Sequence, residues 1–430
     1  MLLEFETENY KSFKDRIKFS MIPAPKQKGL DYSIFHKKIE KKQYKALSSA
    51  VIYGPNASGK SNIIGAIQTL KNIILRGNIR NASSVNSMNV PDYALELIPN
   101  NTLDKKKNVF FSINFIQEEI AVKYFITLDI GMFLEKDAER KIVEENLEIN
   151  KKTVFSRKNN EIIFPEIKDF EEFLIPNFLK NFDTAFSIAQ NSLKSDDLFL
   201  MNGFRNIVSS NLADFIYDYF SNHLKTIYHS EFLHTVPVFN EKAISDKTMN
   251  EAVEEFGINS NKLIYVQENN KEQPILCSVM ENKKIIPSQI FESYGTLRFV
   301  NIYPIIAEVL QKGSTIIIDE FDASIHPSAI MSLINIFHNN EVNINHAQLI
   351  FNTHNPLYLN NNLFRRDEIK FVDRDDKTKC SKHYSLSDFG TKGTSARKGK
   401  DYMNNYFINE YGAIRDIDFT DIFKKIVKEK

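Results

Sequence analysis

Eight consecutive residues, Gly54 to Ser61, have the types and spacing of a phosphate-binding loop. They read Gly-Pro-Asn-Ala-Ser-Gly-Lys-Ser and lie between an apolar run at 50–53 and a run with helical periodicity at 62–75. A strand, a glycine-rich loop and a helix in this order bring backbone N–H groups and a helix N-terminus against phosphates. A tight turn that matches the pattern by chance is the alternative. The flanking strand and helix favour a nucleoside triphosphate site.

Each polar residue of this loop has its own predicted task. Lys60 is expected to reach the β- and γ-phosphates, and the Ser61 hydroxyl is expected to bind Mg²⁺. The predicted nucleotide-binding residues are Gly54, Asn56, Ala57, Ser58, Gly59, Lys60, Ser61 and Asn62.

A second apolar run, at 314–318, ends in an acidic pair. At the carboxyl end of a buried parallel strand beside the loop, Asp319 would hold the Mg²⁺ shell, with Ser61. Glu320 would orient the attacking water and take its proton. Two acids after an apolar strand can also simply cap the next loop, but the phosphate loop upstream favours the catalytic interpretation.

Two further segments carry polar groups suited to phosphate chemistry. The short apolar strand at 348–352 leads to His354, whose imidazole could contact a γ-phosphate, although a histidine at a strand end is often structural. Upstream, Ser293, Gly295 and Thr296 precede an amphipathic run at 297–310 that Gly313 closes. Their hydroxyls and N–H groups would form an anion-binding helix N-terminus without a phosphate loop of its own.

The surrounding elements are predicted from hydrophobic periodicity. Strands are expected at 2–9, 17–21, 109–115, 122–130, 148–155 and 161–164, the first fifty residues forming the sheet that carries the loop. Between 170 and 227 the period changes to a helical one, with apolar residues at 212, 215, 216, 219, 220, 224 and 227. This apolar stripe is typical of a core-facing helix, and an oligomer surface is the alternative.

Composition limits the class of protein. The chain has 430 residues, 42% hydrophobic and 26% charged, which favours a folded protein of two lobes. Because no run of eighteen apolar residues occurs and acids occupy the start of the chain, we expect a cytoplasmic protein without membrane contact. Two cysteines are too few for a disulfide framework or a zinc site, so the expected metal is Mg²⁺ that arrives with the nucleotide. The zero net charge does not indicate nucleic acid, although a local patch could bind it.

These elements, in this order, resemble the ABC-type ATPase heads of the SMC and RecF group. The resemblance implies a signature at 293–296, a Walker B motif at 316–320, a D-loop at 321–327 that includes Asp322, and a switch histidine at His354. In such heads the signature of one subunit closes on ATP held by another, so Ser293, Gly295 and Thr296 would act in trans in a dimer or larger homo-oligomer. The opening segment at 5–13 also looks like the first strand of that group. Neither Gln68 nor Gln117 fits the glutamine loop of the group.

The carboxyl-terminal segments at 369–375, 384–389, 402 and 411–414 resemble the tail of RloA and AbiLi-like ATPases of bacterial anti-phage systems. The ATPase of the PARIS system is related, and OLD-type nucleases fuse a Toprim domain to a similar head. Fewer than eighty residues follow His354, too few for a nuclease domain as well as the closing strands. The resemblance therefore implies a separately encoded effector, such as a Toprim or RloB-type nuclease. A metal triad of Asp373, Asp375 and Asp376 is the less favoured alternative to a solvated turn.

The predicted fold is α/β: an ABC-type P-loop NTPase head with a mixed sheet, a helical signature lobe and a helical insertion. The expected domains are an ATPase lobe at 1–165, a mainly helical insertion at 166–285 and a second ATPase lobe at 286–430. A local basic cluster, made of Lys392, Arg397, Lys398 and Lys400, could bind phosphates or an acidic partner, or form a solvated loop.

Three functional hypotheses follow. The first is an ATP-hydrolysing sensor or scaffold subunit of an abortive-infection complex, with ATP and Mg²⁺ as cofactors, an effector nuclease as partner and a phage product as trigger. The second is an SMC-like or RecF-like ATPase that clamps DNA in repair, which the neutral charge and the lack of a coiled coil disfavour. The third is a nucleotide-gated interaction module without turnover, which Glu320 disfavours.

Overall fold

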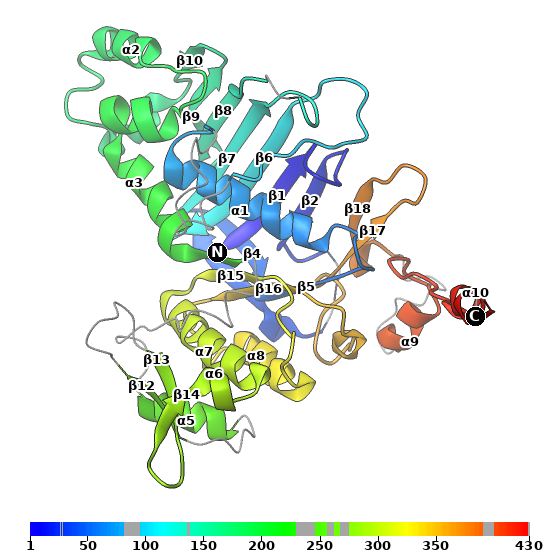
Figure 1. The fold of residues 1–430 in the computed structure, drawn as a ribbon. Helices are drawn as coiled ribbons and strands as arrows, with labels where there is room; N and C mark the ends of the chain where they lie inside the picture. The colour runs from blue at the N-terminus through cyan, green and yellow to red at the C-terminus, as the bar shows by residue number, and fades with distance from the viewer. Residues whose placement is uncertain are drawn as a thin grey trace.

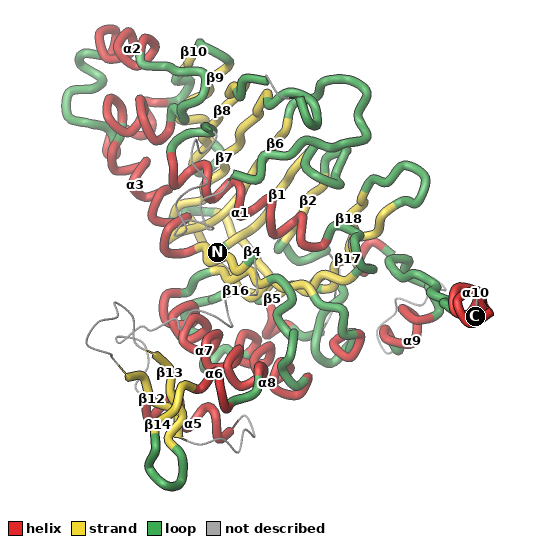
Figure 2. Tube along the Cα trace, in the orientation of Figure 1, coloured by secondary structure: helices red, strands yellow, loops and turns green. Residues whose placement is uncertain are grey.

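The structure is a computed structural model that describes residues 1–25, 27, 29–80, 95–135, 138–228, 246–255, 262–266, 275–389 and 400–428. Within these residues two large sheets dominate the molecule, with helices between and beyond them (Figures 1 and 2). The α/β class with a mixed sheet, predicted from the sequence, is confirmed. None of the described helices is long and apolar enough to cross a membrane.

The central sheet carries the phosphate loop. Its six strands run in the order β11 (Leu224–Ile227), β15 (Thr315–Ile318), β16 (Gln348–Asn352), β5 (Ser49–Tyr53), β17 (Ile369–Arg374) and β18 (Ser381–Ser385). The first five are parallel, and β18 pairs antiparallel with β17. Because parallel strands end at the same edge, the segments that follow β5, β15, β16 and β17 meet there.

The second sheet is antiparallel throughout. Its order is β10 (Glu161–Ile163), β9 (Lys152–Lys158), β8 (Lys141–Ile149), β7 (Ile120–Asp129), β6 (Val109–Gln117), β1 (Leu2–Glu8) and β2 (Ile17–Ser20). The expected strands at 2–9 and 17–21 therefore exist, but they belong to this sheet and not to the sheet that carries the loop. Alternation alone does not say with which partner a strand pairs.

The α-helices of the described residues are α1 (Lys60–Arg76), α2 (Phe182–Asn191), α3 (Ser210–Asp218), α5 (Asp246–Glu255), α6 (Ser288–Phe291), α7 (Tyr294–Lys312), α8 (Pro327–His338), α9 (Tyr402–Phe407) and α10 (Thr420–Lys428). Two π-helices, at Leu200–Val208 and Tyr219–His223, lie on either side of α3. Two small sheets complete the fold: β3 (Ile34–Ile39) with β4 (Lys42–Leu47), and β12 (Lys262–Val266) with β13 (Ile275–Val279) and β14 (Ile285–Pro287).

The central sheet is buried on both faces because its apolar residues alternate between two cores. Ile52 and Ile317 point into a core shared with α1 and the antiparallel sheet. Val51, Ile316 and Ile318 point into a second core, which α7 and α8 cover. A strand covered on both sides reads as a continuous apolar run, which explains why the sequence at 50–53 and 314–318 lacks polar alternation.

Three details differ from the sequence-based expectations. The predicted strand at 148–155 is interrupted by a turn at Asn150 and Lys151, both with positive φ, so that β8 and β9 form a hairpin. The helical period ends near residue 223, because Leu224 and Ile227 lie in β11 at the edge of the central sheet. The segment at 166–285 also contains β11, β12 and β13, so its described part is not helical throughout. The division into three domains stays a prediction.

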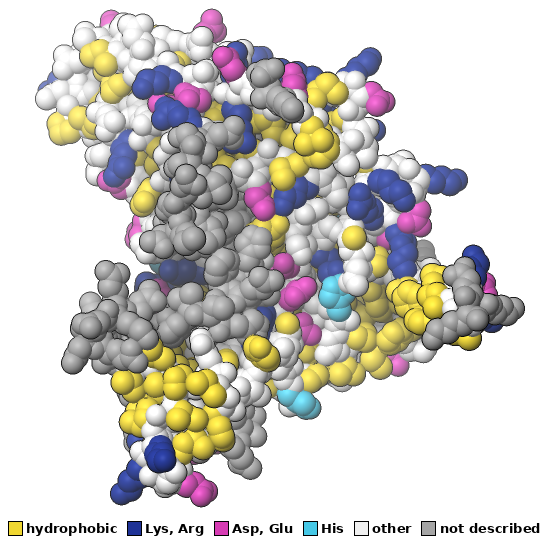
Figure 3. All heavy atoms as spheres, in the orientation of Figure 1, with side chains coloured by type: hydrophobic (Ala, Val, Ile, Leu, Met, Phe, Trp, Pro, Cys, Tyr) yellow, Lys and Arg dark blue, Asp and Glu magenta, His cyan; other side chains and the backbone are white. Residues whose placement is uncertain are grey.

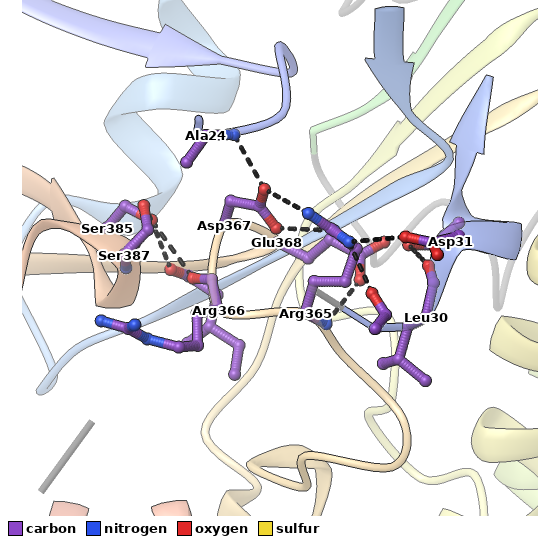
Figure 4. Close-up of polar contacts among 12 residues, drawn as sticks. Ala24, Leu30, Asp31, Arg365, Arg366, Asp367, Glu368, Ser385 and Ser387 are labelled. Carbon is purple, nitrogen blue, oxygen red and sulfur yellow. Dashed lines mark hydrogen bonds and ion pairs between the residues drawn. The ribbon is translucent and has the colours of Figure 1, made fainter. Parts of the chain in front are cut away.

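A buried polar network lies at the amino ends of β5 and β17, at the opposite end of these strands from the phosphate loop (Figure 4). The guanidinium of Arg365 makes two hydrogen bonds to Asp367, each 3.0 Å long. Asp367 accepts a further bond from the Ala24 N–H at 2.8 Å, and Glu368 accepts one from the Ser49 hydroxyl at 3.0 Å. The network therefore fixes the start of β17 and β5 and ties an early loop to them.

Candidate nucleotide-binding site

The loop after β5 packs closely against its neighbours, and two of its glycines make this possible. A Cβ on Gly54 would lie 2.2 Å from the carbonyl oxygen of Val372 in β17. Gly59 has a φ of 106° and precedes α1, and a Cβ there would lie 2.5 Å from the Ser12 hydroxyl. Side chains at either position would force the loop away from its neighbours.

The Lys60 side chain is buried inside the loop. Its ammonium donates to the carbonyl oxygens of Gly54, at 2.8 Å, and Pro55, at 3.1 Å. Burial lowers the pKa of Lys60 to about 8, although Asp319 and Glu320 act to raise it. Triphosphate oxygens would supply the negative charge that this desolvated cation lacks.

Asp319 and Ser61 meet as a potential metal site. The Ser61 hydroxyl donates to Asp319 Oδ1 at 2.9 Å, and the Asn352 amide donates to the same oxygen. Burial raises the pKa of Asp319, while both hydrogen bonds act to lower it. A hydroxyl and a carboxylate of this kind are the hard oxygen ligands that Mg²⁺ prefers beside phosphates. The residues present therefore fit a magnesium ion.

The backbone of Glu320 is held from two sides. Its N–H donates to the Asn352 side-chain oxygen at 2.5 Å, and its carbonyl accepts from the buried Arg298 guanidinium. Glu320 has a φ of 49°, a left-handed conformation that non-glycine residues adopt at a cost. Arg298 belongs to α7, which begins at the predicted signature, and Asn352 ends β16. The two contacts therefore link the predicted general base to α7 and to a neighbouring strand.

These groups surround one pocket of about 590 Å³. Its lining comes from the loop and from the ends of β15, β16 and β17: Asn56, Ala57, Gly59, Lys60, Ser61, Asn62, Glu320, Asn352, His354 and Arg374. A volume of this order suits a small-molecule ligand of nucleotide size. Eight of the site residues predicted from sequence thus line the pocket. A ninth, Asp319, contacts Ser61.

His354 and Asp322 lie close to this pocket. Burial lowers the pKa of His354, and the Lys60 charge lowers it further, while Glu320 and Asp322 act to raise it. Asp322 accepts from the Thr353 hydroxyl at 2.7 Å, and burial raises its pKa. The predicted D-loop and the segment of the switch histidine are therefore in direct contact.

The predicted signature residues lie elsewhere. The Ser293 hydroxyl caps α7 by accepting from the Thr296 N–H at 3.1 Å. A Cβ on Gly295 would lie 2.3 Å from the Ser324 carbonyl oxygen, so the signature packs against the D-loop. Among the described residues that line the pocket, none comes from the signature.

Two serines that the sequence analysis did not single out support the loop. The Ser12 hydroxyl accepts from the Asn62 amide at 2.8 Å, and the Ser381 hydroxyl donates to the Ser58 carbonyl oxygen. Ser12 follows β1 and Ser381 opens β18, so both large sheets contribute to the shape of the loop.

Three other polar residues of the site were missed. Asn352 and Arg374 line the pocket, and Arg298 contacts Glu320 from α7. Position offered a signal for Asn352, which ends the predicted strand at 348–352, whereas no strand was predicted before Arg374. Their residue types alone did not distinguish them from ordinary strand-end polar residues.

The residues considered for the glutamine loop and for a metal triad do not line the pocket. Gln68 accepts from Thr226, and Gln117 donates to Asp218. Asp373 and Asp376 contact Arg415, and Asp375 accepts backbone N–H bonds within its own turn. Over the described residues there is no group of three or more acids, histidines or cysteines that could hold a metal. In the basic cluster, positions 392, 397 and 398 lie outside the described residues, and Lys400 lies in a bend.

A protein-family model described as "AAA domain, putative AbiEii toxin, Type IV TA system" matches residues 49–360. This chain belongs to that family. The match begins at β5, before the phosphate loop, and ends after His354. It therefore includes both helices whose N-termini were predicted to bind phosphates. A search of curated proteins found no match.

Solved structures offer distant similarities. The SMC head domain from Thermotoga maritima is 13% identical, with a TM-score of 0.39, over 89% of this chain and 98% of that one. An SMC head with an extended coiled coil, bound to the C-terminal domain of ScpA derived from Pyrococcus furiosus, is also 13% identical, with a TM-score of 0.37. That match covers 90% of this chain and 97% of the other.

Proposed function

We propose that this chain hydrolyses ATP in the pocket between the phosphate loop and the end of β15. The observation that carries the proposal is the convergence of Lys60, the Ser61–Asp319 pair and Glu320 on one cavity. Lys60 binds the β- and γ-phosphates, and Glu320 accepts the proton of the attacking water. Mg²⁺, held by Ser61 and Asp319, would neutralise charge on the phosphates.

ATP would also join two copies of the chain. Ser293 is exposed at the start of α7 and does not line the pocket of its own chain. The resemblance to SMC and RecF heads supports a contact between this signature and a nucleotide held by a second copy. The nucleotide would then lie within a homodimer interface, or within a larger homo-oligomer.

The biological role we propose is that of a sensor or scaffold in a bacterial abortive-infection complex. The resemblance of the carboxyl-terminal segments to RloA and AbiLi-like ATPases supports a defence role, and the family description names a putative AbiEii toxin of a Type IV TA system. Closure of the ATP-bound heads would hold or recruit a separate effector, a nuclease of the Toprim or RloB type, until a phage product disturbs the assembly. We expect this complex to act in the cytoplasm.

A pull-down from the native cells tests this role. The Glu320→Gln variant with ATP and Mg²⁺ should keep the heads closed and retain an effector in near-equal amounts, as identified by mass spectrometry. The Lys60→Ala variant is the matched control, because it should be unable to close. Recovery of a nuclease-like protein with Glu320→Gln alone would support the proposal. Recovery of nucleic acid without a protein partner would instead favour the DNA-clamping alternative.

A further inference from the structure

Helix α10 presents an apolar face that none of the residues described by the structure covers. All the residues from Asp416 to Val427 are exposed, and the helix lies at the end of a segment that extends away from the central sheet (Figure 1). Six large apolar side chains in this segment are each 55 to 72% exposed: Ile417, Phe419, Ile422, Phe423, Ile426 and Val427. Figure 3 shows apolar side chains gathered in this region.

Five of these six side chains form a single stripe. Phe419, Ile422, Phe423, Ile426 and Val427 follow the spacing i, i+3, i+4, i+7, i+8, which places them on one face of a helix. Asp421, Lys424 and Lys425 occupy the opposite face. Such a separation is typical of a helix that packs against another structure.

Helix α10 is too short to be stable by itself. It has nine residues, whereas isolated helices shorter than about 12 residues are marginal in water and gain most of their stability from packing of the apolar face. At its start the Thr420 N–H donates to the exposed Asp418 carboxylate at 2.8 Å, a contact that leaves the apolar face uncovered. The stripe therefore needs a partner surface.

The stripe has a sequence symmetry that points to its own copy as that surface. Residues 422–427 read Ile-Phe-Lys-Lys-Ile-Val, with apolar pairs placed symmetrically about the midpoint between Lys424 and Lys425. A two-fold axis through that midpoint would place Ile422 beside Val427 of the second copy, and Phe423 beside Ile426. Isologous interfaces require this kind of self-complementary pattern.

The charges favour the same antiparallel arrangement. Acids lie at the start of the segment, at Asp416, Asp418 and Asp421, whereas the sequence from 424 to 430 has four lysines, at 424, 425, 428 and 430, and one acid, Glu429. An antiparallel partner brings the acidic end of one helix near the basic end of the other, whereas a parallel partner would place like charges side by side.

We propose that α10 pairs antiparallel with α10 of a second copy of this chain, through the part of the stripe made by Ile422, Phe423, Ile426 and Val427. This contact does not involve the phosphate loop, so it forms without nucleotide. Each half-exposed side chain offers on the order of 100 Å², so the stripe falls short of the roughly 800 Å² per partner of a standard stable interface. The pair is therefore weak alone. Its effect is to keep two heads at a high local concentration, so that ATP-driven closure becomes an intramolecular step.

Sedimentation equilibrium of the full chain without nucleotide tests the pairing. Wild type should dimerise reversibly over a concentration series up to about 100 μM, and Phe423→Ser should weaken the dimer roughly tenfold or more. Lys424→Ser is the matched control, because it places the same side chain at the next position, on the polar face, and should leave the dimer unchanged. Wild type that stays monomeric, or equal effects of the two substitutions, would overturn the proposal.

Disulfide trapping tests the orientation. Two differently tagged chains, one with Phe423→Cys and one with Ile426→Cys, should form a mixed disulfide under mild oxidation, whereas Phe423→Cys alone should give little dimer. Preferential cross-linking of Phe423→Cys with itself would rule out the antiparallel pair. Because neither experiment contains ATP, failure here leaves the proposed ATPase untouched, and a chain without ATPase activity could still pass both.

Discussion

Helices α1 and α7 both begin at segments that were predicted to bind phosphate, yet their first turns differ. The first turn of α1 follows Gly59 and has no side-chain cap, and it lies inside the pocket. The first turn of α7 is capped by its own Ser293, at the surface and outside the pocket. The N-terminus of α1 thus faces a pocket of its own chain without a side-chain cap, whereas the N-terminus of α7 is capped by Ser293.

The difference suggests that the N-termini of α1 and α7 have different functions. The uncapped N–H groups of α1, with Lys60 beside them, can bind phosphate without any rearrangement of helix caps. At α7 the Ser293 hydroxyl already accepts from Thr296, so a nucleotide must approach from outside and share this group. We therefore expect α1 to determine nucleotide affinity and α7 to determine assembly.

The largest effect is expected from Lys60→Ala. Loss of the buried cation should reduce ATP affinity by roughly 100-fold or more, because the phosphates lose their charged partner in a desolvated loop. Isothermal titration with ATP and Mg²⁺ measures this change, and Lys158→Ala, at the exposed end of β9, is the control. ATP affinity equal to that of wild type would refute the assignment of the loop.

Glu320→Gln should separate binding from turnover. The amide keeps the shape of the carboxylate but cannot take a proton, so phosphate release should fall by roughly 100-fold while ATP affinity stays close to that of wild type. Single-turnover phosphate release and titration with ATP measure the two quantities. Persistent turnover would mean that another residue positions the water.

Ser293→Arg should affect assembly alone. A large cation at the start of α7 should block approach of a second copy, so the ATP-dependent increase in mass should disappear in the Glu320→Gln background. Binding of ATP by the monomer should be unchanged. Light scattering measures the mass, and Ser187→Arg on the exposed face of α2 is the control. A normal closed dimer from Ser293→Arg would contradict the contact in trans.

The smallest effect is expected from Arg298→Met. This change removes the hydrogen bond from α7 to the Glu320 carbonyl and should lower kcat roughly tenfold with little change in ATP affinity, because the general base loses part of its alignment. Arg298→Lys, which can still donate to that carbonyl, should recover part of the rate. Parallel losses of rate and thermal stability in both variants would indicate a structural role only.

The site could be predicted from sequence where its chemistry lies in a contiguous motif. Lys60, Ser61 and the Asp319–Glu320 pair each stand in a short pattern with a physical reason for every position. Asn352, Arg374 and Arg298 could not be found in this way, because their roles depend on which strands and helices become neighbours. Strand order decides this, and hydrophobic periodicity does not report strand order.

The same reason explains the errors in the fold. The alternating strands at 2–9 and 17–21 were predicted correctly as strands, but β1 pairs with β6, about a hundred residues away in sequence. The apolar residues at 224 and 227 are compatible with a helix and with a strand. They form a strand because this segment pairs with β15.

The position of β5 has a consequence for the synthesis of the chain. Both of its neighbours in the sheet, β16 and β17, lie about three hundred residues downstream, and Ser381 supports the loop from later still. A growing chain therefore carries every residue of the phosphate loop long before it can fold the loop. Because such distant contacts form late, a ribosome-bound fragment that ends before β16 should be unable to retain ATP.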